Sequence, residues 1–269
     1  MHVPDGFLDL PTSVATGAVA AAGVGLALRG ARRELDDRTA PMAGLVATFV
    51  FAAQMVNFPV GLGTSGHLLG GALAAVLVGP WTGVLAVSVV LAVQALLLAD
   101  GGITALGTNV TLLAVVGVAV GWLVFRGLQM LLPKKMALVP VLAAIGALVS
   151  VPAAALVFVG LYAVGGTAPV PLDGLAAAML GWHTLIGIGE ALITVAVVQA
   201  MPFVVNTEGV FAAPSRTTRL EPVLGGPHIQ SRAPPRARAG PARPTGPRPR
   251  SKLVSTASMA SHVPDFGEA

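Results

Sequence analysis

Long apolar runs dominate the first 205 residues, and polar residues are confined to short breaks between these runs. A helix needs about 20 mostly apolar residues to cross the ~30 Å hydrocarbon layer of a bilayer, or somewhat fewer where neighbours thin it. The pattern therefore predicts an all-α integral membrane protein, a compact bundle of about seven transmembrane helices. The predicted spans are residues 11–29, 41–57, 67–80 (the shortest), 82–99, 102–125, 136–163 and 175–205.

Composition supports a bilayer environment. Hydrophobic residues make up 55% of the chain and charged residues 10%, where soluble domains have about 25% charge. Glycine and alanine are frequent inside the runs, and small residues let helices pack closely in lipid. There is no cysteine, which excludes disulfides, thiolate metal sites and thiol nucleophiles. Any metal would need nitrogen or oxygen ligands.

The positive charges predict how the chain crosses the membrane. Through residue 205 there are seven Lys and Arg against eight Asp and Glu, and the other nine cations follow. The basicity therefore belongs to the tail, and we expect no nucleic-acid partner. Short loops rich in Lys and Arg stay cytoplasmic. With seven crossings and the N-terminus outside, residues 29–38, residues 126–135 and the tail all lie on the cytoplasmic side of a bacterial cell membrane.

The chain divides into two parts of different composition. Residues 1–205 form the predicted transmembrane domain. Residues 206–269 are rich in Pro, Gly, Ser and Arg and bury too little apolar surface to fold, so we expect a disordered basic cytoplasmic tail. The first residues lack the basic region of a secretory signal peptide, and Met1 is the expected mature N-terminus.

The opposite, outer end carries only acidic charge. Asp5, Asp9, Asp100 and Asp173 fall in or beside the predicted outer segments, without Lys or Arg. This arrangement favours a negative entrance that concentrates cations. Exclusion of cations from outer loops explains the same pattern, and both interpretations stay open.

The first two residues offer an unusual set of metal ligands. The Met1 amine, the His2 backbone amide and the His2 side chain can close two small chelate rings around one ion. Three nitrogens in a plane suit Ni(II), Cu(II) and Co(II) better than Mg or Ca. In most proteins a histidine at this position is incidental and the terminus frays.

A second candidate is the glycine-rich outer segment from Val56 to His67. Non-helical backbone at membrane depth survives only where protein covers it or where it lines a cavity, so this segment, with Asn57 and Ser65, is a site candidate. His67 either supplies a fourth nitrogen or is a buried histidine bonded to a loop carbonyl. Gly61, Gly63 and Gly66 also spell a dinucleotide fingerprint, which we reject because no strand pattern precedes it. No P-loop sequence occurs.

Other polar residues interrupt the later spans. Gln94, Asp100 and Asn109 lie close together in sequence, and His183 and Glu190, seven residues apart, share one helical face. Ionisable groups inside spans favour a functional interpretation, while a hydrogen-bond network between helices explains them equally well. Thr48, Gln54 and Ser88 carry little information.

On these residues the chain resembles the CbiM/NikM family, the substrate-capture subunits of energy-coupling-factor (ECF) transporters for cobalt and nickel. The resemblance spans residues 1–200. It rests on Met1-His2 with Asp5-Gly6-Phe7-Leu8, Val56 to Pro59, Gly63 to Gly71, Gly79-Pro80-Trp81, Gln94, Asp100 to Gly107, and His183 through Gly187 to Leu192.

The resemblance implies a site and partners. The N-terminal segment would insert into the bundle from outside, so that the Met1 amine, the His2 amide and imidazole nitrogens and the His67 imidazole form a nearly square-planar site. The implied partners are a transmembrane coupling subunit, cytoplasmic ATPase subunits and a small accessory membrane subunit. From about Gln199 onward the chain departs from the family pattern, as a native extension or an altered reading frame would. No fused accessory subunit is recognisable.

The sequence thus predicts a non-enzymatic transport subunit that captures Co(II) or Ni(II) for uptake, without distinguishing the two metals. The resemblance implies that cobalt taken up in this way often feeds cobalamin biosynthesis. The alternative is a capture subunit or secondary transporter for a small organic solute, with His67, His183 and Glu190 as hydrogen-bonding groups. An intramembrane metallohydrolase ranks last, because the chain lacks a helical His-Glu-x-x-His.

Overall fold

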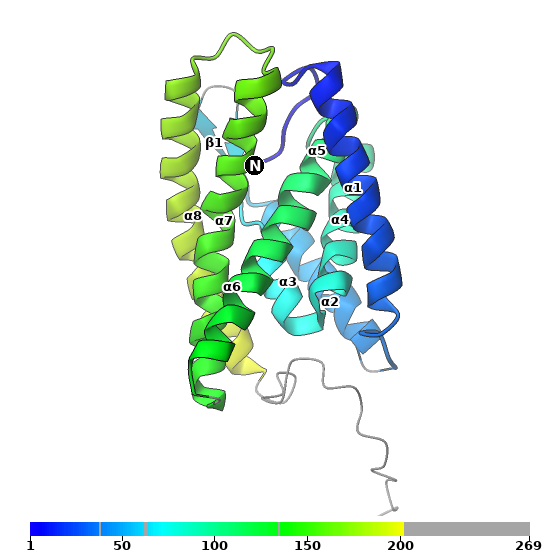
Figure 1. The fold of residues 1–269 in the computed structure, drawn as a ribbon, viewed down its shortest axis with the longest axis vertical. Helices are drawn as coiled ribbons and strands as arrows, with labels where there is room; N and C mark the ends of the chain where they lie inside the picture. Colours follow the sequence, from blue (N-terminus) through cyan, green and yellow to red (C-terminus); the bar gives the residue numbers. More distant parts are fainter. Residues whose placement is uncertain (38, 62–63, 134, 202–269) are drawn as a thin grey trace, which may run out of the picture. The chain divides into compact units, whose positions relative to one another are not determined.

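The computed structural model describes residues 1–37, 39–61, 64–133 and 135–201 (Figure 1). Each of the seven apolar runs contains a helix, which confirms the predicted all-α membrane bundle. The elements are α1 (Leu10–Ala31), α2 (Thr39–Gln54), β1 (Phe58–Gly61), β2 (Thr64–Gly66), α3 (Gly71–Val78), α4 (Pro80–Leu97), α5 (Leu106–Asn109), the π-helix η1 (Val110–Val116), α6 (Gly117–Leu131), the 3₁₀ turn η2 (Met136–Leu138), α7 (Val139–Gly165) and α8 (Leu172–Ala200).

Length separates these helices into two groups. Within the described residues, five helical segments are long and apolar enough to cross a membrane: Leu10–Ala31, Pro80–Leu97, Leu106–Leu131, Met136–Gly165 and Leu172–Ala200. The helix α2 is apolar but has 16 residues. Residues 202–205 of the predicted last span, and the predicted tail 206–269, lie outside the described residues.

The third predicted span is wrong in extent. The sequence suggested residues 67–80, but α3 has only eight residues and rises about 12 Å. Every residue of α3 is buried, and the helix contacts α2, α4, α6 and α7. The irregular stretch before it, residues 67–70, is therefore covered by protein, which is the condition for non-helical backbone at membrane depth.

A short hairpin precedes this irregular stretch. The strands β1 and β2 pair antiparallel, with Phe58 opposite Gly66 and Pro59 opposite Ser65. The expectation that no strand forms here was wrong, because a glycine-rich segment can satisfy its backbone groups by pairing with itself. The two strands do not belong to a βαβ unit, so the dinucleotide fingerprint remains without its structural context.

The N-terminal segment, residues 1–9, is inserted among the helices, as the fold prediction stated (Figure 1). Its outer part is fixed to the end of α7, where the Asp9 amide donates to the Gly165 carbonyl at 2.7 Å. The Thr167 amide donates to the Phe7 carbonyl at 3.1 Å. The Asp9 side chain then caps α1 by accepting from the Thr12 amide. The inserted segment thus ends at Asp9, where α1 begins.

Within the described residues, positive charge is confined to one end of the helices. The described cations Arg29, Arg32, Arg33, Arg126 and Lys135 lie at the end of the bundle where α1 and α6 finish. At the end of the bundle where α1, α5 and α8 begin (Figure 1), the chain carries Asp5, Asp9, Asp100 and Asp173. The fold therefore keeps the charge asymmetry that the sequence shows.

Candidate metal site

The N-terminal segment is held in the bundle by Val3. The Val3 amide donates to Oδ1 of Asn109 at 2.7 Å, and Nδ2 of Asn109 donates back to the Val3 carbonyl at 3.1 Å. The Gly102 amide also donates to the Val3 carbonyl, at 3.0 Å. As a result Met1 and His2 are 2% and 7% exposed. A chain end that would normally fray is packed inside the protein.

A tight turn after α4 brings a carboxylate to His2. Nδ1 of His2 donates to Oδ1 of Asp100 at 2.9 Å. The turn needs positive φ at Ala99 (53°) and Gly101 (92°). A Cβ at Gly101 would lie 3.1 Å from Nδ2 of Asn109 and 3.4 Å from His2, so glycine lets the turn approach both residues.

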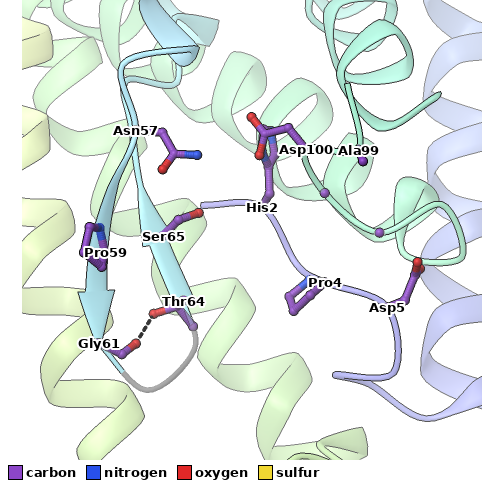
Figure 2. Close-up of a pocket in the computed structure, with 12 residues that line it drawn as sticks. His2, Pro4, Asp5, Asn57, Pro59, Gly61, Thr64, Ser65, Ala99 and Asp100 are labelled. Atoms are coloured by element: carbon purple, nitrogen blue, oxygen red, sulfur yellow. Dashed lines mark hydrogen bonds and ion pairs between the residues drawn. The ribbon is translucent and has the colours of Figure 1, made fainter. Parts of the chain in front are cut away.

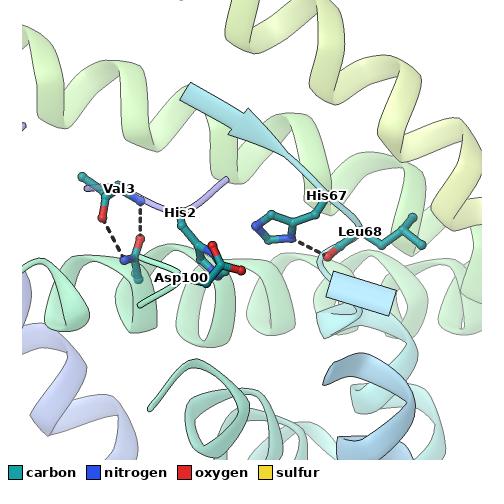
Figure 3. Close-up of polar contacts among 6 residues, drawn as sticks. His2, Val3, His67, Leu68 and Asp100 are labelled. Atoms are coloured by element: carbon teal, nitrogen blue, oxygen red, sulfur yellow. Dashed lines mark hydrogen bonds and ion pairs between the residues drawn. The ribbon is translucent and has the colours of Figure 1, made fainter. Parts of the chain in front are cut away.

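The structure brings the predicted ligand His67 against His2. The two imidazole rings have their centroids 4.4 Å apart and are tilted by 40° (Figure 3). His67 is fully buried, and its Nδ1 donates to the Leu68 carbonyl at 2.8 Å. Nε2 of His2 and Nε2 of His67 are both buried without a hydrogen-bond partner in the described part of the chain. For His67, the N–H donated to the Leu68 carbonyl leaves Nε2 free, which is the arrangement of a histidine prepared to ligate a metal.

Burial sets the protonation of the Met1 amine and the His2 imidazole. It lowers the pKa of the Met1 amine well below its usual value, against the opposing charge of Asp100. Burial also lowers the pKa of the His2 imidazole, against its hydrogen bond with Asp100. The hydrogen bond from His2 in turn lowers the pKa of Asp100. The amine and the His2 imidazole are thus held as neutral nitrogens beside a carboxylate, and neutral nitrogen is the form that binds metal.

Side chains alone do not complete a metal site. In the described ranges of the chain, no group of three or more His, Asp or Glu side chains converges closely enough to hold a metal ion. An ion between His2 and His67 would therefore need main-chain nitrogen, and the buried Met1 amine with the His2 amide is the available source.

A pocket of about 570 Å³ lies on the outer side of His2 (Figure 2). The predicted residues Asn57, Ser65 and Asp100 line it, with the hairpin on one side and the N-terminal segment and the 99–102 turn on the other. The full lining is His2, Pro4, Asp5, Asn57, Pro59, Gly61, Thr64, Ser65, Ala99, Asp100, Gly101 and Gly102. Because Pro4, Asp5 and Asn57 are exposed, the pocket connects His2 with the outer surface.

The remaining predicted residues lie deeper. Gln94 is fully buried, and its side-chain amide has no hydrogen-bond partner among the described residues. His183 and Glu190 are buried on α8. Nδ1 of His183 donates to the Met179 carbonyl at 2.7 Å. Both carboxylate oxygens of Glu190 accept backbone N–H groups, from Leu69 at 2.8 Å and Gly70 at 3.0 Å.

The sequence interpretation missed Gln54. We treated it as uninformative, yet it is fully buried at the end of α2, and its Nε2 donates to the Leu69 carbonyl at 2.7 Å. The available signal was its position as a polar residue in an apolar run just before the glycine-rich segment. Distance in sequence hides the contact, because Leu69 lies 15 residues further on.

Comparison with known proteins places the chain in a family. The family profile described as the cobalt uptake substrate-specific transmembrane region, CbiM, matches residues 2–205. The chain belongs to the CbiM family. A relative from Haloquadratum walsbyi, a putative metal transport protein, is 40% identical over 199 residues, which cover 73% of this chain and 88% of the relative.

Other members of the family include longer proteins. The putative fused nickel transport protein NikMN of Archaeoglobus fulgidus is 38% identical over 205 residues, which cover 74% of this chain but only 64% of the relative. The cobalt transport protein CbiM of Geobacter sulfurreducens is 39% identical over 136 residues, 49% of this chain and 39% of that protein.

Two solved structures share the fold. The crystal structure of a truncated transition metal transporter aligns with a TM-score of 0.68 and 31% identity, covering 75% of this chain and 98% of that one. A second transition metal transporter aligns with a TM-score of 0.69 and 31% identity, covering 76% and 93%. The chain is thus a multi-pass membrane protein of the CbiM family.

Proposed function

We propose that this chain captures Co(II) or Ni(II) for import, with the Met1 amine, the His2 amide and imidazole and the His67 imidazole as ligands. The observation that carries the proposal is the burial of the chain terminus with the His2 and His67 rings 4.4 Å apart. Membership of a family described by cobalt uptake, and relatives named for nickel and cobalt transport, support the same cargo.

Loading requires one contact of the structure to change. A chelate that runs from the amine through the His2 amide closes on Nδ1 of His2, because Nε2 is too far along the ring. Nδ1 donates to Asp100 in this structure. Metal binding must therefore break the bond between His2 and Asp100 and displace the proton that Nδ1 carries. The His2 amide must also release its N–H proton to solvent, because an amide nitrogen coordinates only when deprotonated.

The ion reaches the ligands through the outer pocket in this proposal. Asp5 and Asp100 place negative charge along its wall, and the described residues that line it include no Lys or Arg. A hydrated divalent cation is attracted to such a wall before it exchanges water for nitrogen. The pocket faces the outside of the cell if the cationic end of the bundle is cytoplasmic.

Release would depend on partners that supply ATP hydrolysis. The sequence has no P-loop, so we propose cytoplasmic ATPase subunits, a transmembrane coupling subunit and a small accessory membrane subunit of an ECF transporter. Relatives described as fused nickel transport proteins are consistent with an additional membrane part in this system. Residues 1–205 would form the capture domain, with residues 206–269 as a separate tail.

The organic-solute alternative loses support from the geometry. Its hydrogen-bonding residues, His67, His183 and Glu190, are not among those that line the outer pocket. Both oxygens of Glu190 are already engaged by backbone N–H groups. Elemental analysis of the purified protein distinguishes the two functions, since a metal-capture subunit should retain stoichiometric Co or Ni.

The position of the amine gives a direct test. Adding Gly-Ser before Met1 converts the amine into a peptide amide and moves the chain end away from the chelate. We expect Ni(II) binding measured by isothermal titration calorimetry to fall at least about 100-fold, as loss of a primary ligand would produce. Peptide mass measurement should first establish that the unextended protein begins with a free Met1 amine.

The control carries the same Gly-Ser pair after Ala269. It should bind Ni(II) like the unmodified protein, and both variants should have the same thermal unfolding temperature without metal. High-affinity binding in the N-terminally extended variant would refute ligation by the amine.

A further inference from the structure

The turn that presents His67, residues 67–70, is held from two sides through Leu69. The Leu69 carbonyl accepts from Nε2 of Gln54 at 2.7 Å, and the Leu69 amide donates to Oε2 of Glu190 at 2.8 Å. The other oxygen of Glu190 accepts from the Gly70 amide at 3.0 Å. Gln54 ends α2 and Glu190 lies in the middle of α8, so two helices far apart in sequence meet at one residue of the turn.

These contacts are costly to build and are therefore informative. Gln54 is 0% exposed and Glu190 is 2% exposed. A carboxylate inside a membrane bundle is strongly disfavoured unless it is fully hydrogen-bonded. The two N–H groups provide those bonds, and the positive N-terminal end of α3, which begins at Gly71, adds favourable electrostatics. An apolar pair at these positions would pack the helices without this cost.

The turn has few other internal restraints. Residues 67–70 belong to neither a helix nor a strand. Gly70 adopts φ 74°, a left-handed conformation that ends the irregular stretch as the N-cap of α3. Within the described residues, the His67 ring has one hydrogen bond, to the neighbouring Leu68 carbonyl, which moves with the same turn. The direction of Nε2 of His67 therefore depends on what fixes Leu69.

We propose that Gln54 and Glu190 are positioning residues that clamp the turn and direct Nε2 of His67 at the metal beside His2. They act through the backbone of Leu69 and do not contact the ion. The inference rests on the proposed function, because it assigns the residues that orient one of its ligands. It also makes metal ligation by His67 depend on the packing of α2 and α8.

Two substitutions remove one side of the clamp each. Glu190→Gln keeps the size of the side chain but replaces one acceptor oxygen by an NH₂ group that opposes a backbone N–H. Gln54→Leu removes the donor to the Leu69 carbonyl. Thr194→Val is the matched control, since Thr194 is also fully buried on α8, one turn after Glu190, and its hydroxyl has no partner in the described residues.

The readout counts the nitrogens around the metal. Cu(II) accepts the same planar nitrogen donors, and its electron paramagnetic resonance spectrum shows hyperfine splitting from each coordinated nitrogen. The full chain in detergent should show four nitrogens, and His67→Ala should show three. We expect three also in Glu190→Gln and Gln54→Leu, with Ni(II) affinity at least about 10-fold weaker. Thr194→Val should keep four nitrogens and unchanged affinity.

Each result decides between the proposals. Four nitrogens and unchanged Ni(II) affinity in both clamp variants would overturn the clamp, and a loss in only one would overturn its two-sided form. If Glu190→Gln does not fold, as judged by size-exclusion chromatography, Gln54→Leu alone decides. If the unmodified chain and His67→Ala give the same spectrum, His67 is not a ligand, and both the proposed ligand set and the clamp are overturned.

Discussion

The chemistry of the candidate site depends on two buried groups being neutral, the Met1 amine and the His2 imidazole. Burial lowers the pKa of the Met1 amine and of the His2 imidazole, so the protein prepares ligands that would otherwise carry protons near neutral pH. Asp100 opposes this effect at both groups. Its carboxylate raises the pKa of His2 through the hydrogen bond and that of the amine through its charge.

This opposition predicts a pH effect at Asp100. Metal binding is lost as pH falls through the pKa of the ligands, because protonated nitrogen does not coordinate. Asp100→Asn removes the charge that raises those pKa values, so they fall further. We expect the acid limb of the Ni(II) affinity profile, measured by calorimetry between pH 4 and 8, to move to lower pH.

The direction of that change is diagnostic. A shift of the acid limb to higher pH would contradict the assigned role of Asp100. Asp173→Asn is the matched control, since Asp173 is an exposed carboxylate in the first turn of α8 and should leave the profile unchanged.

At the level of elements, the site depends on an extended segment held inside a helical bundle. Asn109 makes both hydrogen bonds that a neighbouring strand would offer to Val3. It is the last residue of α5, and the π-helix η1 begins directly after it. Single π-helical turns are frequent at functional sites, because they change the direction in which the following side chains point. Here the change in helix type coincides with the residue that binds the N-terminal segment.

Asn109→Ala tests this connection. The substitution leaves the buried amide and carbonyl of Val3 without these partners, which costs about 1–3 kcal/mol. We expect Ni(II) affinity to fall by roughly 5- to 150-fold. Hydrogen exchange of residues 1–9 should become faster while exchange in α7 stays unchanged.

Thr167 gives the comparison with Asn109. Thr167→Val removes an exposed hydrogen bond to the Gly6 carbonyl, at the outer end of the same segment. It should change the affinity by less than about threefold. An equal loss in both variants would indicate that the whole segment, and not the Asn109 contact, controls binding.

At the level of the whole molecule, charge separation predicts orientation. The described cations lie at one end of the helices and four carboxylates at the other. The positive-inside rule places the cationic end in the cytoplasm and the pocket beside His2 outside.

The absence of cysteine makes orientation measurable. In intact cells, a membrane-impermeant maleimide should label Asp173→Cys but reach Arg33→Cys only after permeabilisation, since both positions are exposed at opposite ends. The reverse pattern would contradict an outward-facing pocket.

The sequence by itself determined the bundle and named Met1, His2 and His67 as candidate ligands. Apolar runs of sufficient length predict membrane helices, because a helix in lipid satisfies its own backbone hydrogen bonds. The adjacency of Met1 and His2 is local, so a chelate could be proposed from sequence.

Only the tertiary structure decided which distant groups meet. Packing across the bundle produces the short helix α3 and the hairpin before it. The same packing produces the contacts of Leu69 with Gln54 and Glu190. Apolar periodicity does not encode them, because a short buried helix and a longer span look alike in an apolar run. The meeting of His2 with His67, 65 positions later in the chain, depends on the same packing.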